Sequence, residues 1–181
     1  MSEAAFTDMM VAEMPYLRAF ALSLSGSASV ADDLVQETLV KAWSHADSFE
    51  TGTNFRAWLV TILRNTYFNQ YRKLSREVQD SDHIHAGQIA VGGGQETSVA
   101  MRDVQRAINL LPADQREILL MIGVTELSYE EAAQICNIAV GTVKSRLNRA
   151  RVRLAELLGL TGDNPTGLER AGEDRKNPLS S

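Results

Sequence analysis

One short stretch of the chain, residues 139–153, carries five basic side chains and no acidic one. Within this stretch and just after it, apolar residues recur at spacings of four, three and four at Val143, Leu147, Ala150 and Leu154. This spacing predicts an amphipathic helix with one apolar side buried and its basic side free. Basic side chains on a helix can bind phosphates and reach base edges in the major groove of DNA. The same pattern also fits a solvated face or a surface for an acidic partner.

A second, shorter helix is predicted just before this one. Ser128 and Glu131, three residues apart, have the spacing of a capping box, which opens a helix. Asn137 tolerates a left-handed backbone conformation, so it can end that helix in a tight turn before Val140 restarts the chain as a helix. Two helices around a tight turn, the second of them polar, predict a helix-turn-helix, whose second helix enters the major groove.

A second acid-free window covers residues 51–76 and predicts a helix that Asn54 can cap. Its basic residues are Arg56, Arg64, Arg72, Lys73 and Arg76. Aromatic residues share this helix, and cations for phosphates combined with rings for stacking are how proteins hold single-stranded bases. The helical spacing of the rings assigns most of them to the core, so we expect one or two to touch nucleic acid.

The rest of the chain is acidic, and the net charge of all 181 residues is −5. An acidic remainder repels nucleic acid, so we expect weak DNA binding by the protein alone and a partner that brings it to DNA. No apolar run approaches the ~20 residues that span a bilayer, and no secretory signal is visible. The single cysteine, Cys136, suits a reducing compartment, so we expect a cytoplasmic protein without membrane contact.

Helical periodicity along the chain predicts an all-α fold of two small domains. The predicted segments are an N-terminal domain at 1–77, a flexible linker at 78–95, a C-terminal domain with the helix-turn-helix at 96–160 and a disordered tail at 161–181. Pro15 should kink the first helix or mark a later start, and Ser29 should open the second.

No arrangement of residues indicates an enzyme. His83 and His85 beside Asp82 suggest a metal site, but the predicted linker lacks the fixed geometry and the number of ligands that a metal requires. We find no paired carboxylates on a cleft, no Ser/His/Asp set and no phosphate-binding loop. We therefore expect no metal, no cofactor, no small-molecule substrate and no enzymatic activity.

Three segments, in this order, resemble sigma factors of the extracytoplasmic-function (ECF) type, which initiate bacterial transcription. DDLVQETLVKAW resembles the family's helix that docks on the RNA polymerase clamp, and NFRAWLVTILRNTYFNQYRK resembles the helix that melts the downstream promoter element. LPADQREILLM with LSYEEAAQICNIAVGTVKSRLNRAR resembles the domain that reads the upstream element. The similarity covers residues 16–158 except the linker. The family usually has Gly where Asn137 stands and Pro or Ser where Ala139 stands, so we expect a local adjustment of the turn.

The resemblance implies three sets of contact residues. The set for the upstream element is Gly141, Thr142, Lys144, Ser145, Arg146, Asn148 and Arg149. The set that holds a flipped base and melts the downstream element is Phe49, Glu50, Thr51, Gly52, Thr53, Arg56, Trp58 and Asn65. The set that meets core RNA polymerase is Leu34, Gln36 and Glu37.

The sequence is most similar to the alphaproteobacterial general stress response sigma factors. That resemblance implies core RNA polymerase, promoter DNA and a small helical anti-sigma factor as partners. Two alternatives stay open: a sigma-like decoy that binds the anti-sigma factor without DNA, and a dimeric helix-turn-helix repressor. A decoy of this kind carries a receiver domain after the sigma-like part, and a repressor leaves DDLVQE and the aromatic, basic helix unexplained.

Overall fold

The computed structural model describes residues 2–79 and 99–160, with side chains for 2–72 and 99–160. Over these ranges the protein has seven α-helices, one short 3-10 helix and no strand, so the predicted all-α fold is confirmed. None of the described helices is long and apolar enough to cross a membrane. Most of the predicted linker and the whole predicted tail lie outside the described residues.

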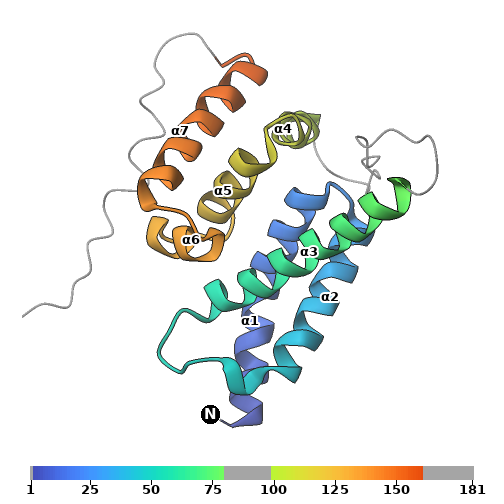
Figure 1. Ribbon diagram of the computed structural model, residues 1–181, viewed down its shortest axis with the longest axis vertical. Helices are drawn as coiled ribbons and strands as arrows, with labels where there is room; N and C mark the ends of the chain where they lie inside the picture. The colour runs from blue at the N-terminus through green and yellow to red at the C-terminus, as the bar shows by residue number, and fades with distance from the viewer. Residues whose placement is uncertain (1, 80–98, 161–181) are drawn as a thin grey trace, which may run out of the picture.

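The N-terminal half is a three-helix unit of α1 (Glu3–Ser25), α2 (Ala28–Ser44) and α3 (Phe55–Gln79), with a 3-10 turn at Ala46–Ser48 (Figure 1). Helix α1 runs through Pro15, so the later start that Pro15 suggested is wrong. Met10 and Leu17 on either side of Pro15 are buried, and tertiary packing of this kind outweighs the loss of one backbone hydrogen bond.

The second helix begins earlier than predicted. Gly26 adopts a left-handed conformation, with φ of 71°, and ends α1. This turn leaves Ser27 extended, which is the backbone geometry of an N-cap, and its hydroxyl oxygen accepts the Val30 backbone N–H at 3.4 Å. Ser27 rather than Ser29 therefore caps α2.

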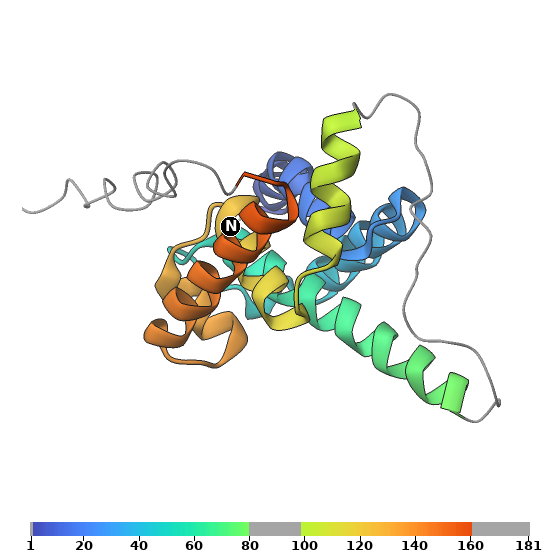
Figure 2. The same ribbon diagram turned by 90° about the horizontal axis from the view of Figure 1, so that it is seen from above.

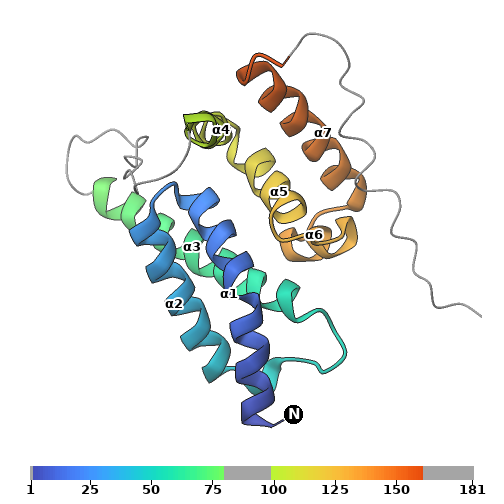
Figure 3. The ribbon, with the colours of Figure 1, turned by 180° about the vertical axis from the view of Figure 1, so that it is seen from behind.

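The C-terminal half contains α4 (Val99–Asn109), α5 (Ala113–Gly123), α6 (Tyr129–Cys136) and α7 (Val140–Leu157). Pro112 lies directly before α5. A backbone N–H at this position would find no acceptor within the helix, so the proline costs no hydrogen bond. Helices α5 and α6 support α7, and Figures 1 and 3 show both of them between α7 and the N-terminal half. Figure 2 shows the C-terminal end of α3 projecting from the body of the molecule.

The two halves pack against each other instead of standing apart. Their buried apolar side chains join in one continuous core, in which Leu59 and Leu63 of α3 and Ile118 and Met121 of α5 are all fully buried. Polar contacts add to this packing: the Gln105 amide of α4 donates to the Ser23 carbonyl of α1 at 3.2 Å. In the described part of the chain, the two halves therefore share one core and are held together by polar contacts as well.

Candidate nucleic-acid interface

Local sequence holds the turn before α7 in place. Ser128 accepts the Glu131 backbone N–H at 3.1 Å, and the Glu131 carboxylate accepts the Ser128 backbone N–H at 2.8 Å, so the predicted capping box is confirmed. Asn137 is left-handed, with φ of 53°, as predicted. The Ile138 N–H then donates to the Ala133 carbonyl at 3.0 Å, which closes the turn before α7 restarts at Val140.

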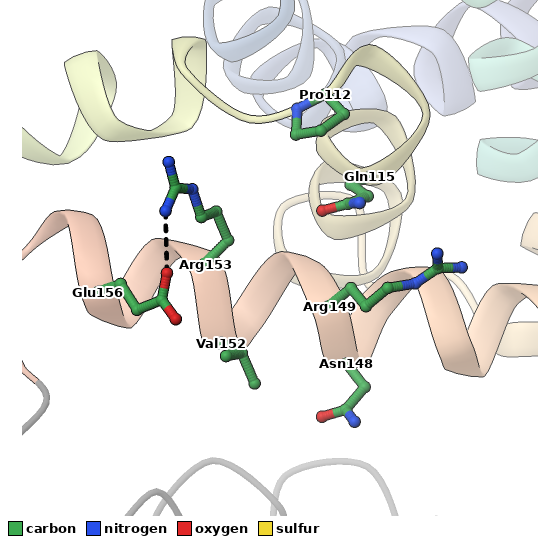
Figure 4. Close-up of a pocket in the computed structure, with 7 residues that line it drawn as sticks. All are labelled: Pro112, Gln115, Asn148, Arg149, Val152, Arg153 and Glu156. Carbon is green, nitrogen blue, oxygen red and sulfur yellow. Dashed lines mark hydrogen bonds and ion pairs between the residues drawn. The ribbon is translucent and has the colours of Figure 1, made fainter.

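Helix α7 has one buried and one exposed side. Val143, Leu147 and Ala150 are at most 2% exposed and pack toward α5 and α6. The opposite side presents Gly141, Lys144, Ser145, Asn148 and Arg149, all exposed, with Thr142 half-buried beside them. Figure 4 shows the side chains of Asn148 and Arg149 extending from the helix in different directions. Because this face carries no acid, it can approach a polyanion without like-charge repulsion.

The basic residues of α7 are not equivalent. Arg149 is exposed and donates only to its own helix, from Nε to the Ser145 carbonyl at 3.3 Å. Arg146 instead forms an ion pair with Asp114 of α5 at 3.2 Å, and its side chain is only 26% exposed. The structure thus places Arg146 at the junction of α5 and α7, whereas the other predicted residues of this set face outward.

The loop before α3, residues 50–53, is the second part of the candidate interface. Glu50, Thr51, Gly52 and Thr53 are all exposed, and Gly52 has φ of 97°, a conformation that requires glycine. Asn54 caps α3 as predicted, because its Oδ1 accepts the Ala57 backbone N–H at 3.2 Å. The loop is therefore exposed along its whole length, directly before α3.

The two aromatic residues predicted to hold a base, Phe49 and Trp58, are more buried than expected. Phe49 is 9% exposed, and its ring packs 4.9 Å from Phe55 and 5.4 Å from Trp58 between centroids. Trp58 is half-buried in the same aromatic cluster. The Phe49 side chain is therefore part of the core next to the loop and is not open to solvent. Asn65, farther along α3, is exposed.

Two basic residues of α3 are paired with acids of other helices. Arg64 forms an ion pair with Glu117 of α5, and Arg56 pairs with Glu13 of α1 at 2.6 Å. Burial lowers the pKa of both guanidinium groups, but the hydrogen bonds and charges of Glu117 and Glu13 outweigh burial and raise the pKa above the ordinary value. Both arginines stay charged, and their charges are matched inside the protein.

On α2 the structure corrects one predicted contact and adds two residues. Leu34 is 1% exposed, so its side chain cannot meet polymerase in this conformation. Gln36 is exposed and Glu37 half-buried. One and two turns after Gln36 on the same face, Val40 and Trp43 are 61% and 44% exposed. Neither residue was among the predicted polymerase contacts, and their exposure is visible only in the packed structure.

Within the described residues no group of three or more His, Cys, Asp or Glu side chains could hold a metal ion. The sequence's weak candidate, His83 and His85 with Asp82, lies outside the described residues.

Two family descriptions match the chain in the order of its two halves. Sigma-70 region 2 matches residues 9–77, which contain α2 and most of α1 and α3, and Sigma-70 region 4 matches residues 101–154, which span most of α4 to α7. The chain is 49% identical over 160 residues to the ECF RNA polymerase sigma factor EcfG of Rhodopseudomonas palustris, covering 88% of each chain. It is 34% identical over 141 residues to the ECF RNA polymerase sigma factor SigM of Bacillus subtilis, covering 76% of this chain and 85% of that protein.

A solved structure shares the fold. It is the sigma factor RpoE of Bartonella quintana in complex with the anti-sigma factor NepR, with a TM-score of 0.80 and 50% identity. The match covers 87% of this chain and 99% of that one.

Proposed function

We propose which surface of this chain carries out each step of promoter recognition and opening. The chain belongs to the extracytoplasmic-function sigma factors, non-enzymatic proteins that direct core RNA polymerase to promoters. The observation that carries the proposal is the outward side of α7, where exposed polar and basic side chains stand opposite a fully buried stripe. A helix anchored in this way can enter the major groove without unfolding its support.

The upstream element is read by α7. Lys144, Ser145, Asn148 and Arg149 meet base edges, and Gly141 and Thr142 near the helix start approach phosphates. Arg146 holds α7 against α5 through Asp114, so its contribution is to position the reading helix.

The downstream element is held by the loop at 50–53 and by Asn65. The loop is exposed, and the Thr53 N–H and hydroxyl donate to the Glu50 carbonyl at 3.1 and 2.7 Å, which fixes its turn. Phe49, directly before the loop, is anchored in the aromatic cluster with Phe55 and Trp58. Unstacking a base costs a few kcal/mol, and a preformed loop recovers part of that cost when it captures the base. Arg56 contributes charge to this surface once its present partners release it.

Core RNA polymerase binds the exposed side of α2. Gln36 and Glu37 supply polar contacts, and Val40 and Trp43 supply apolar area in the following turns. Large apolar side chains beside polar ones are typical of protein interfaces. Leu34 contributes indirectly, because its buried side chain anchors α2 in the core.

An anti-sigma factor controls the protein, which acts in the cytoplasm on a general stress response regulon. The half-identical RpoE of Bartonella quintana is found in a complex with the anti-sigma factor NepR, and EcfG of Rhodopseudomonas palustris is similar over most of both chains. These likenesses support a small protein inhibitor as the partner that keeps this chain from polymerase.

A reconstituted transcription assay tests the proposal. The purified chain is mixed with core RNA polymerase and a set of candidate promoters, and unpaired thymines near the start site are detected with permanganate. Asn65→Ala should still bind promoter DNA in the holoenzyme but open fewer thymines, because Asn65 acts only after bases unstack. Polymerase that initiates at no promoter with the wild-type chain would favour the decoy, and tight DNA binding as a dimer without polymerase would favour the repressor.

A further inference from the structure

A phenylalanine near the start of α1 contacts aromatic rings of two other helices. Phe6 is 4% exposed, and its ring centroid lies 6.1 Å from that of Trp43 on α2. On α3 the neighbouring centroids are those of Phe55 at 5.4 Å and Trp58 at 6.2 Å. All three pairs are edge-to-face, with interplanar angles of 63–76°. One residue of α1 therefore packs against aromatic residues of both α2 and α3.

The rings around Phe6 lead to two of the proposed binding surfaces. Trp43 is 44% exposed and lies on the side of α2 proposed to bind polymerase. Phe55 and Trp58 pack against Phe49, the residue directly before the downstream loop. Within the described residues, Phe6 is the one aromatic ring paired with Trp43, so it connects Trp43 to the rings beside the loop.

An aromatic ring restricts the orientation of its neighbours. Edge-to-face pairs have a preferred geometry, so the buried Phe6 ring limits how Trp43 can turn. A side chain that is already ordered loses less freedom when a partner binds, and the complex is tighter for that reason. The same argument applies to the loop, because Phe49 at its start is held by rings that Phe6 contacts.

We propose that Phe6 is a positioning residue for both surfaces. Its ring holds Trp43 in the orientation that meets core RNA polymerase, and it holds the rings that anchor Phe49 beside the downstream loop. This inference rests on the proposed roles of α2 and of the loop, and the sequence assigned no residue of α1 to either. Loss of the Phe6 ring should therefore weaken polymerase binding and strand opening, although Phe6 is itself too buried to touch polymerase or DNA.

The test compares the same substitution at two buried phenylalanines of one helix. Phe6→Leu removes the ring that contacts α2 and α3. Phe20→Leu is the control, because Phe20 is 0% exposed on α1 and belongs to none of the ring pairs among the described residues. Both variants lose core packing, so thermal melting is measured first and all assays are run below both transitions.

Polymerase binding is measured by fluorescence anisotropy of the labelled full-length chain titrated with core RNA polymerase. Phe6→Leu should bind roughly threefold to tenfold more weakly than Phe20→Leu. In a Trp43→Leu background, Phe6→Leu should weaken binding by less than about twofold further, because the side chain that it positions is gone. At saturating polymerase, permanganate should detect at least about twofold fewer unpaired thymines with Phe6→Leu than with Phe20→Leu.

A spectroscopic measurement follows the rings without polymerase. The two tryptophans of the chain, Trp43 and Trp58, both contact Phe6. The tryptophan bands of the near-ultraviolet circular dichroism spectrum should therefore weaken in Phe6→Leu and stay close to the wild type in Phe20→Leu. Phe6→Met fills a similar volume without a ring, so it should give the same result if Phe6→Leu fails to fold.

Three results would overturn the proposal. Equal polymerase affinities of Phe6→Leu and Phe20→Leu would overturn the role at Trp43, and equal strand opening would overturn the role at the loop. Identical tryptophan bands in the two variants would overturn the positioning itself. Wild-type protein that opens no promoter with polymerase would refute the proposed function, whereas the spectra of the free chains would still decide whether Phe6 orders the tryptophans.

Discussion

Arg146 and Arg149 should respond differently to truncation, although they lie three residues apart on the same helix. Arg149 donates only to Ser145 of its own helix and is exposed, so Arg149→Ala should change the free energy of unfolding by less than about 0.5 kcal/mol. Its proposed base contact is worth ~1–3 kcal/mol, which corresponds to a loss of roughly 5- to 150-fold in affinity for the preferred upstream element.

Arg146→Ala should instead act on the fold. Its partner Asp114 is 49% exposed and Arg146 itself 26%, so solvent screens the ion pair and the loss should be about 0.5–1 kcal/mol of unfolding free energy. Discrimination between upstream element variants should stay close to the wild-type ratio, because the base-reading side chains remain in place.

The assay pairs urea denaturation of each free variant with binding of its holoenzyme to matched and mismatched upstream elements. Arg153→Ala is the control for loss of one positive charge on α7, because Arg153 is exposed and paired with Glu156 at 3.0 Å on the same helix. Loss of discrimination in Arg146→Ala at unchanged stability, together with wild-type discrimination in Arg149→Ala, would refute the assignment of roles on α7.

Three further predictions concern the support of α7. Asn137→Gly should raise and Asn137→Ala should lower the unfolding free energy, with a difference of about 1–2 kcal/mol between them in urea titrations, because φ is 53° at this position; equal stabilities would contradict the strain argument. Leu147→Ala should cost about 2–5 kcal/mol by the same method, since Leu147 is 2% exposed, and a loss below about 1 kcal/mol would show that α7 is loosely packed. Burial raises the pKa of the Cys136 thiol from 9.0 to about 11, and the charge of Glu117 adds to this. Alkylation by iodoacetamide near neutral pH should therefore be slow until urea unfolds the chain. The contribution of Cys136 to stability should be complete below about pH 9 and lost as the pH rises toward about 11, because only the unfolded thiol releases its proton in that window. Equally fast alkylation of the folded and unfolded chains would contradict the buried thiol.

The local features of the helix-turn-helix could be predicted from the sequence because their causes lie within a few residues. The capping box of Ser128 and Glu131 spans three positions, and Asn137 sets the turn through its own backbone preference. The spacing of Val143, Leu147 and Ala150 already defined which side of α7 is buried. The outward residues of the reading face follow from that stripe by helical geometry alone.

The partners of the basic residues were decided by the tertiary structure. Glu117 lies 53 positions from Arg64, and the Thr125 carbonyl lies 69 positions from Arg56. Helical periodicity predicts which face of a helix is buried, but it does not identify the segment that packs there. The basic residues of the acid-free window at 51–76 therefore looked free to bind phosphate. Val40 and Trp43 show the same limit from the other side, because both are large apolar residues and the packing leaves them 61% and 44% exposed. Chain-distant contacts leave no local pattern, since their energy depends on positions that exist only after the two halves have packed together.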